Sequence, residues 1–383
     1  MNRRIPALTL FVCSWCAAQT APPSQELDRR LMQVETDREQ GRLAAAEPLV
    51  TQLERDVERV EGPGQRLAAV LREHGLLRDD ADRPREAIPY YERALAMLRA
   101  LPDLPAPSVA LVIANLAGSH SDAGDFDQAL SLSAEAMAML EAAGQKDTPV
   151  YAVAQSAHGF ALHGLGRIAE ALRNLRASLS ILQRMDQPKN PQLAVVAEGI
   201  GACLFDLGYT SQAEASERQA LDIRMAFFGP DSLPVAISNN NLGVMLAREQ
   251  RFSEGQQLLE RSAQSLERIG EDEIRRLDSV LGNLGRVYVQ QARNTRSFYG
   301  KAEDIFRRQL AIEERIFGDS DVRESATLES LGEVLYRERS YNEAGQLYGR
   351  GVALQKAALG PADPAAVAAA RRYSVLAKKM SAR

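Results

Sequence analysis

ALDIRMAFFGPDSLPVAISNNNLGVMLAREQRFSEG, residues 220–255, is the stretch that decides the fold. One helix is expected to end at the break Gly229-Pro230-Asp231, because glycine and proline commonly follow a helix terminus. A second helix should carry Leu242-Gly243, and a polar turn follows at Glu249 to Arg251. A third helix opens at Phe252. The stretch therefore predicts helices that pair across a short turn.

The same unit recurs along nearly the whole chain. Each copy has a small anchor residue near the start of its second helix, and successive anchors lie 41, 42, 42, 42, 42, 47 and 42 residues apart. The anchors are Ala46, Ala87, Ala129, Ala171, Ala213, Gly255, Ala302 and Ala344. A fixed period in this range is typical of a stacked repeat array.

A second pattern lies upstream of the anchors, in the first helix of the unit. Several copies carry a large residue followed by a small one, which would let two helices approach closely. These pairs are Leu116-Ala117, His158-Gly159, Ile200-Gly201, Leu242-Gly243, Leu284-Gly285 and Leu331-Gly332. The pattern is weaker in the first two copies, where the pair is missing around Gln33-Val34 and the second turn is Arg83-Pro84-Arg85.

This combination resembles the tetratricopeptide repeat, whose usual period is 34 residues. The longer unit, with LDIRMAFFGPD at 221–231 and LAIEERIFGDS at 310–320, is similar to the kinesin-light-chain type. The resemblance runs from about residue 26 to 383 and is most specific over 107–270. It implies an all-α fold, a right-handed α-solenoid of about eight helix hairpins with a concave groove. It implies nothing about a motor.

The period and the turns together place the expected helices. They lie near 26–38, 43–60, 65–79, 85–100, 107–122, 126–143, 149–164, 168–185, 191–206, 210–228, 233–248, 252–269, 273–292, 299–317, 321–338 and 341–358. The 47-residue spacing puts extra residues in the turn around Arg293 to Gly300. A final unpaired helix, 364–380, suits the cap that an array needs over its last apolar face.

Residues 1–18 have the form of a secretory signal peptide. Arg3 and Arg4 precede a short apolar core, and Cys16-Ala17-Ala18 offers small residues for cleavage. The apolar core is too short to span a bilayer, which needs about 20 residues. A polar leader, 19–25, then precedes the array, 26–383. We therefore expect export to a bacterial periplasm or secretion, with no transmembrane segment in the mature chain. A lipidated Cys13 or Cys16 and an unstructured start are the alternatives.

Composition narrows the classes of partner. The net charge is −5, which disfavours nucleic acid as a partner because a nucleic-acid binder needs a basic stripe. Two of the three cysteines lie in the N-terminal segment, so the mature chain can hold neither a disulfide framework nor a cysteine zinc site. Cys203 is expected to be a buried small residue instead of a reactive thiol.

No catalytic constellation is visible in the sequence. The four histidines lack metal-ligand spacing, and no G-x-S-x-G elbow, HExxH helix or P-loop occurs. We therefore expect no enzyme, no cofactor and no metal site. The basic residues between Arg293 and Arg308 are interpreted as a solvated face, with an anionic partner as the alternative.

The candidate site is the groove. In the resembled family the first helix of each hairpin lines the concave surface, and the residues mapped there are Asn115, Phe160, Phe205, Asn241, Val244, Asn283, Arg286, Glu329 and Glu333. The three asparagines each precede a large–small pair, and their amides could hold a peptide backbone. For the charged residues two interpretations stay open. They recognise a ligand, or Arg286 pairs with Glu329 or Glu333 across neighbouring repeats.

The sequence thus predicts a non-catalytic interaction module of an exported protein. Its groove would hold an extended or helical segment of another protein. The alternative is a scaffold that self-associates within a cell-envelope assembly.

Overall fold

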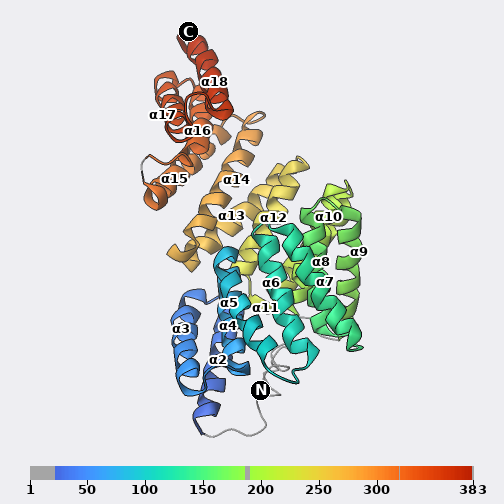
Figure 1. Cartoon of the computed structure of the whole chain (residues 1–383). Coiled ribbons are helices and arrows are strands. Elements are labelled where there is room, and N and C mark those ends of the chain that lie inside the picture. The colour runs from blue at the N-terminus through green and yellow to red at the C-terminus, as the bar shows by residue number, and fades with distance from the viewer. Residues whose placement is uncertain (1–21, 186–189, 319, 382–383) are drawn as a thin grey trace. The chain divides into compact units, whose positions relative to one another are not determined.

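The computed structural model describes residues 22–185, 190–318 and 320–381, which form an all-α protein (Figure 1). Within these residues lie seventeen α-helices and one short 3₁₀ helix, η1 (Glu271–Glu273). Sixteen of the α-helices pair into eight hairpins, and α18 (Pro364–Ser381) stands alone at the end. The predicted all-α solenoid of helix hairpins is therefore confirmed. The predicted signal peptide lies outside the described residues.

The chain divides into two units, Met1–Pro234 and Val235–Arg383. The hairpins of the first unit are α2 (Pro22–Glu39) with α3 (Leu43–Val60), α4 (Gln65–Asp80) with α5 (Pro84–Ala100), α6 (Ala106–Asp122) with α7 (Phe126–Ala142), α8 (Pro149–Gly164) with α9 (Ile168–Gln183), and α10 (Pro191–Asp206) with α11 (Thr210–Phe228). The hairpins of the second unit are α12 (Leu233–Arg248) with α13 (Phe252–Ile269), α14 (Ile274–Ala292) with α15 (Phe298–Phe317), and α16 (Glu324–Glu338) with α17 (Tyr341–Leu359). Helix α12 begins two residues before the unit itself.

Within each unit a hairpin packs against the next hairpin along the chain. In the first unit, α6 contacts α5, α7 and α8, and α10 contacts α9 and α11. In the second unit, α14 contacts α13 and α15, α16 contacts α15 and α17, and α18 covers α17. Burial therefore depends on neighbours in the chain, as expected of a repeat array.

A small residue of the first helix receives a large side chain of the second helix in six of the described hairpins. A Cβ added at Gly285 would lie 2.5 Å from the ring of Phe306, and one at Gly75 would lie 2.6 Å from the ring of Tyr91. The six pairs are Gly75 with Tyr91, Gly159 with Leu175, Gly201 with Glu217, Gly243 with Leu259, Gly285 with Phe306, and Gly332 with Tyr348. The large–small motif thus sets the close approach within a hairpin. Gly75 extends this packing to the second copy, where the sequence pattern is weaker.

Two helix starts differ by more than one residue from the expected positions. Helix α2 begins at Pro22, inside the expected polar leader, since proline suits the first turn of a helix. Helix α16 begins at Glu324 and not at residue 321. Asp321 accepts a hydrogen bond from the backbone N–H of Arg323 at 2.9 Å, which holds residues 321–323 in a turn.

No helix in the described part of the chain is long and apolar enough to cross a membrane.

Candidate functional site

Two cavities lie along α14 in the second unit. The first, the α14–α18 cavity, has a volume of about 510 Å³. It is lined by Arg286, Val289, Gln290, Phe306, Ala326, Glu329, Ser330, Glu333, Tyr348, Val352, Ala369, Arg372, Tyr373 and Leu376. The second, the α12–α14 cavity, has a volume of about 630 Å³. It is lined by Val244, Ala247, Arg248, Gln250, Phe252, Asn283, Arg286, Val287, Gln290, Arg293 and Asn294.

The two cavities share Arg286 and Gln290. These residues are four apart on α14, so they lie on one face of the helix, one turn from each other. The cavities therefore adjoin at this face of α14. Five of the predicted groove residues line them: Val244, Asn283, Arg286, Glu329 and Glu333.

Arg286 does not make the ion pair that was one of the two predicted alternatives. Its Nη2 donates to Oδ1 of Asn283, one turn earlier on the same helix. No carboxylate among the described residues forms an ion pair with it. Burial lowers the pKa of the guanidinium, with no neighbouring carboxylate to offset that effect.

Glu329 and Glu333 have other partners. Arg372 of α18 lies 3.0 Å from a carboxylate oxygen of Glu329. Arg337 donates to Glu333 at 2.7 Å, and the hydroxyl of Tyr348 donates to it at 3.1 Å. Both carboxylates are thus neutralised by partners other than Arg286, and their pairing helps to hold α16, α17 and α18 together.

The predicted asparagines of the second unit are joined across repeats. Asn283 donates to Oδ1 of Asn240 at 2.8 Å, and Asn240 donates to Oδ1 of Asn241 at 3.2 Å. The amide group of Asn283 therefore has an acceptor in Asn240 and a donor in Arg286. Asn240, which was not among the predicted groove residues, is the link between the two predicted positions.

The remaining predicted residues belong to the first unit and do not line the two cavities. Asn115 is half-buried, and its Nδ2 is a buried donor without a hydrogen-bond partner among the described residues. Phe160 packs on the next hairpin, since a Cβ added at Gly199 would lie 2.5 Å from its ring. Phe205 is half-buried on α10. For Phe160 the close contact identifies a role in packing between repeats.

Several cavity residues were not among the predicted groove residues. Arg248, Gln290, Arg293 and Asn294 line the α12–α14 cavity, and Tyr373 lines the other. Asn283, Arg286 and Gln290 lie at helical spacing on α14, and Arg293 directly follows its last residue. That spacing is the signal that could have identified them.

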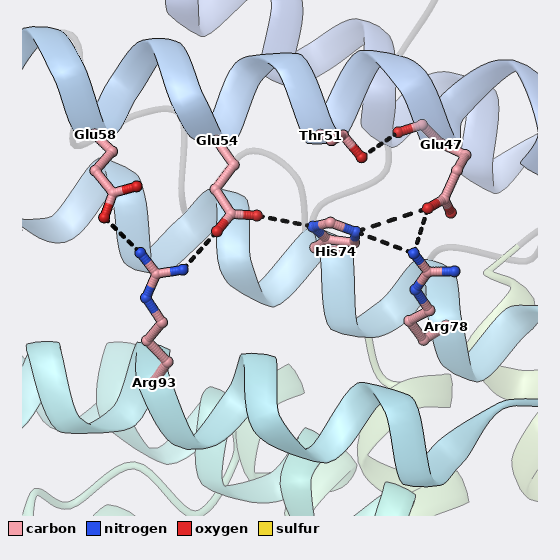
Figure 2. A network of polar contacts seen from close by, with 7 residues as sticks. All are labelled: Glu47, Thr51, Glu54, Glu58, His74, Arg78 and Arg93. Atoms are coloured by element: carbon pink, nitrogen blue, oxygen red, sulfur yellow. Dashed lines mark hydrogen bonds and ion pairs between the residues drawn. The ribbon is translucent and has the colours of Figure 1, made fainter.

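A polar network in the first unit joins α3, α4 and α5 (Figure 2). The buried ring of His74 stacks on Tyr90 with 4.0 Å between centroids, and its Nδ1 lies 3.0 Å from Oε2 of Glu54. Arg93 donates to the other oxygen of Glu54 at 2.5 Å. The hydrogen bond to His74, followed by that from Arg93, lowers the pKa of Glu54 against the opposing effect of burial. The charges compensate one another, so the network stabilises the packing of three helices.

The other reactive side chains do not gather into a site. His158 accepts or donates a hydrogen bond with Ser133 at 3.0 Å, and His163 lies 2.8 Å from Asp206. Cys203 is a buried free thiol, and burial raises its pKa to about 11. Across the described ranges there is no group of three or more histidine, cysteine, aspartate or glutamate residues that could hold a metal.

Comparison with known proteins gives a family for the centre of the chain. Residues 108–184 and 150–226 match the family described as tetratricopeptide repeat. No curated protein matches the chain.

Solved structures share the fold at low sequence identity. A signal transduction ATPase with a tetratricopeptide repeat sensor from Pyrococcus horikoshii has a TM-score of 0.60 at 13% identity, covering 94% of this chain and 54% of that one. Rap protein complexed with Competence and Sporulation Factor has a TM-score of 0.55 at 14% identity, covering 91% and 92%. A putative kinesin light chain from Podosopora anserina has a TM-score of 0.47 at 17% identity, covering 56% and 99%.

The family match and the described hairpins indicate the same helical repeat. The matched segment comprises α6–α11, and the hairpins on either side continue its mostly 42-residue spacing. Residues 108–226 match the tetratricopeptide repeat, and the hairpins on either side continue the same all-helical repeat fold.

Proposed function

We propose that the second unit binds an extended segment of another protein along α14, in the two adjoining cavities. The observation that carries this proposal is that Arg286 and Gln290 line both cavities. Each cavity has a volume within the range of about 300–1,000 Å³ that is usual for ligand sites. A segment that occupies both must pass over the exposed face of α14.

The lining has the chemistry that a peptide needs. Phe306, Tyr373 and Leu376 give the α14–α18 cavity apolar walls, which would cover an apolar side chain of the ligand. Gln290 and Asn294 offer side-chain amides that have no hydrogen-bond partner in the described part of the chain. An amide provides both a donor and an acceptor, which matches a peptide backbone.

A known protein of this fold supports the proposal at the level of the fold. Rap protein was solved in complex with Competence and Sporulation Factor, so this fold is able to carry a bound factor. For the present chain, the argument rests on the lining of the two cavities and not on that resemblance.

Site-specific photocrosslinking tests the proposal. A benzophenone amino acid replaces Val289, which lines the α14–α18 cavity, in the full-length protein expressed in its source cells. The matched control carries the same group at Gln346, an exposed residue of α17 outside both cavities. We expect position 289, and not 346, to crosslink to a segment of another protein. Crosslinks that join only two copies of this chain would favour the self-associating scaffold instead.

We further propose that this module acts after export, since residues 1–18 have the charged start, apolar core and small exit residues of a signal peptide. Fractionation of the source cells, with detection of the chain in the exported fraction, tests this part independently of the binding site.

A further inference from the structure

The α12–α14 cavity has an unbalanced charge. Three arginines line it, Arg248, Arg286 and Arg293, together with Gln250, Asn283, Gln290 and Asn294. No aspartate or glutamate is among the described residues that form its lining. The chain as a whole has a net charge of −5, so this concentration of positive charge runs against the overall composition.

Several other arginines of the second unit are neutralised by carboxylates. Five of them lie 2.5 to 2.7 Å from a partner: Arg307 with Glu343, Arg308 with Glu267, Arg315 with Glu271, Arg337 with Glu333, and Arg350 with Glu324. Arg286 and Arg293 have no carboxylate partner in the described ranges, and both line the same cavity. The cavity therefore keeps positive charge that the rest of the unit does not compensate.

Arg286 is held in place without being neutralised. The hydrogen bond to Asn283 fixes one end of its guanidinium, and Asn283 is itself fixed by Asn240. Arg286 is exposed at the mouth of the cavity, partial desolvation lowers its pKa, and no carboxylate among the described residues offsets that effect. A carboxylate of a ligand would restore that balance, and guanidinium and carboxylate can form two parallel hydrogen bonds.

We propose that the α12–α14 cavity recognises the aspartate or glutamate side chains of an acidic segment in a partner protein, with Arg286 and Arg293 as the anion-binding residues. This inference rests on the proposed function, because it names the chemistry of the segment that the second unit binds.

The lining of the α12–α14 cavity also offers apolar contacts to the rest of the ligand. Val244, Phe252 and Val287 provide apolar contacts for the methylene groups of an acidic side chain. The adjoining α14–α18 cavity brings apolar residues and the neutralised carboxylates of Glu329 and Glu333. The acidic residues of the segment therefore belong in the α12–α14 cavity, and its apolar residues in the α14–α18 cavity.

A displayed library of random twelve-residue peptides, selected on the full-length protein, tests the inference. We expect the selected peptides to be enriched in aspartate and glutamate. Selected sequences are then synthesised with both termini blocked, and their affinities are measured by fluorescence anisotropy. Replacing glutamate by glutamine in such a peptide, or Arg286→Gln in the protein, should weaken binding about tenfold, since charge-assisted hydrogen bonds are the strong ones.

Arg293→Gln is expected to weaken binding in the same direction. Arg371→Gln is the matched control, since Arg371 is exposed on α18, lies outside both cavities and loses the same charge. Thermal melts of all variants establish that each one folds. Wild-type affinity should also fall more steeply with salt than that of Arg286→Gln, because one screened charge pair is absent from the variant.

The outcomes separate the two proposals. Peptides that bind in the cavities without acidic enrichment, and with equal affinity for the wild type and Arg286→Gln, would overturn the acidic segment and leave peptide binding intact. A library that yields no binder would overturn both. Equal weakening by Arg286→Gln and Arg371→Gln would show a general charge effect and would also contradict the assignment.

Discussion

At the scale of single residues, Glu217 departs from the packing rule of its neighbours. The other five hairpins with a small–large pair place tyrosine, leucine or phenylalanine on the small residue of the first helix, whereas α11 places Glu217 on Gly201. Glu217 is 4% exposed, and its Oε2 has no hydrogen-bond partner in the described part of the chain. Burial, followed by the charge of Glu198 and against that of Arg224, raises its pKa to about 8.

This residue makes stability depend on pH. The folded-state pKa of Glu217 lies above the value of 4.5 expected for the unfolded chain, so the folded state binds the extra proton between about pH 4.5 and 8. The free energy of unfolding should therefore fall as pH rises through this window, by at most about 1.4 kcal/mol per pH unit from this group. Glu217→Leu should reduce the slope and add about 1–3 kcal/mol at pH 8.

Urea unfolding of wild type and Glu217→Leu at pH 5, 6.5 and 8 measures both effects. Glu217→Gln is the matched control, since it keeps the shape of the side chain and removes the titration. The same pH slope in all three proteins would contradict the assignment.

Asn283 gives a second prediction at this scale. Asn283→Ala removes the acceptor that holds Arg286 and the donor that joins Asn240. Binding of an acidic peptide should weaken by about 0.5–1.5 kcal/mol, the net contribution of a hydrogen bond. Titration calorimetry measures the peptide affinity of Asn283→Ala, and thermal melts measure its stability. A lower melting temperature with unchanged affinity would mean that this asparagine serves only the packing of the repeats.

At the scale of elements, the close approach of α12 and α13 depends on Gly243. A Cβ there would lie 3.0 Å from Leu259 and 3.1 Å from the carbonyl oxygen of Gly255. Gly243→Leu should therefore force these helices apart and cost about 1–3 kcal/mol by overpacking. Gly118→Leu is the control, because a Cβ at Gly118 meets nothing within 4 Å.

Hydrogen exchange measures which helices lose protection in the Gly243→Leu variant. Because each hairpin packs mainly on its neighbours, protection should be lost in α12–α15 and retained in α2–α9. Uniform loss over all described helices would mean that the chain unfolds as one cooperative body.

The sequence predicted the helices because their limits depend on local signals that repeat. Gly229-Pro230 and the anchors are such signals, and fully buried Ala213 and Ala302 have the expected role. The site was less predictable, because it depends on which side chains meet between hairpins. Phe160 meets Gly199, Asn283 meets Asn240, and Arg286 meets neither of the predicted glutamates. A period fixes the face on which a residue lies, but not its partner on the next hairpin.

At the scale of the whole molecule, we propose that residues 1–18 direct the chain to export. The signal-peptide form of residues 1–18 predicts that mature protein begins near residue 19. N-terminal sequencing of the chain recovered from the exported fraction of its source cells checks this. A chain that retains Met1 in that fraction would contradict cleavage.

The packing within each hairpin affects how the number of repeats can change in evolution. Five of the six small–large pairs lie 16 residues apart, as Gly75 with Tyr91 and Gly332 with Tyr348, and each pair is complete within a single copy. A duplicated or deleted segment of 42 residues therefore carries its own internal packing and leaves the pairs of the other copies unbroken. The array can lengthen or shorten by whole units through recombination of its gene, whereas an insertion of any other length must be absorbed in a turn. The 47-residue spacing is an insertion of that second kind, and its extra residues fall around the turn 293–297 between α14 and α15.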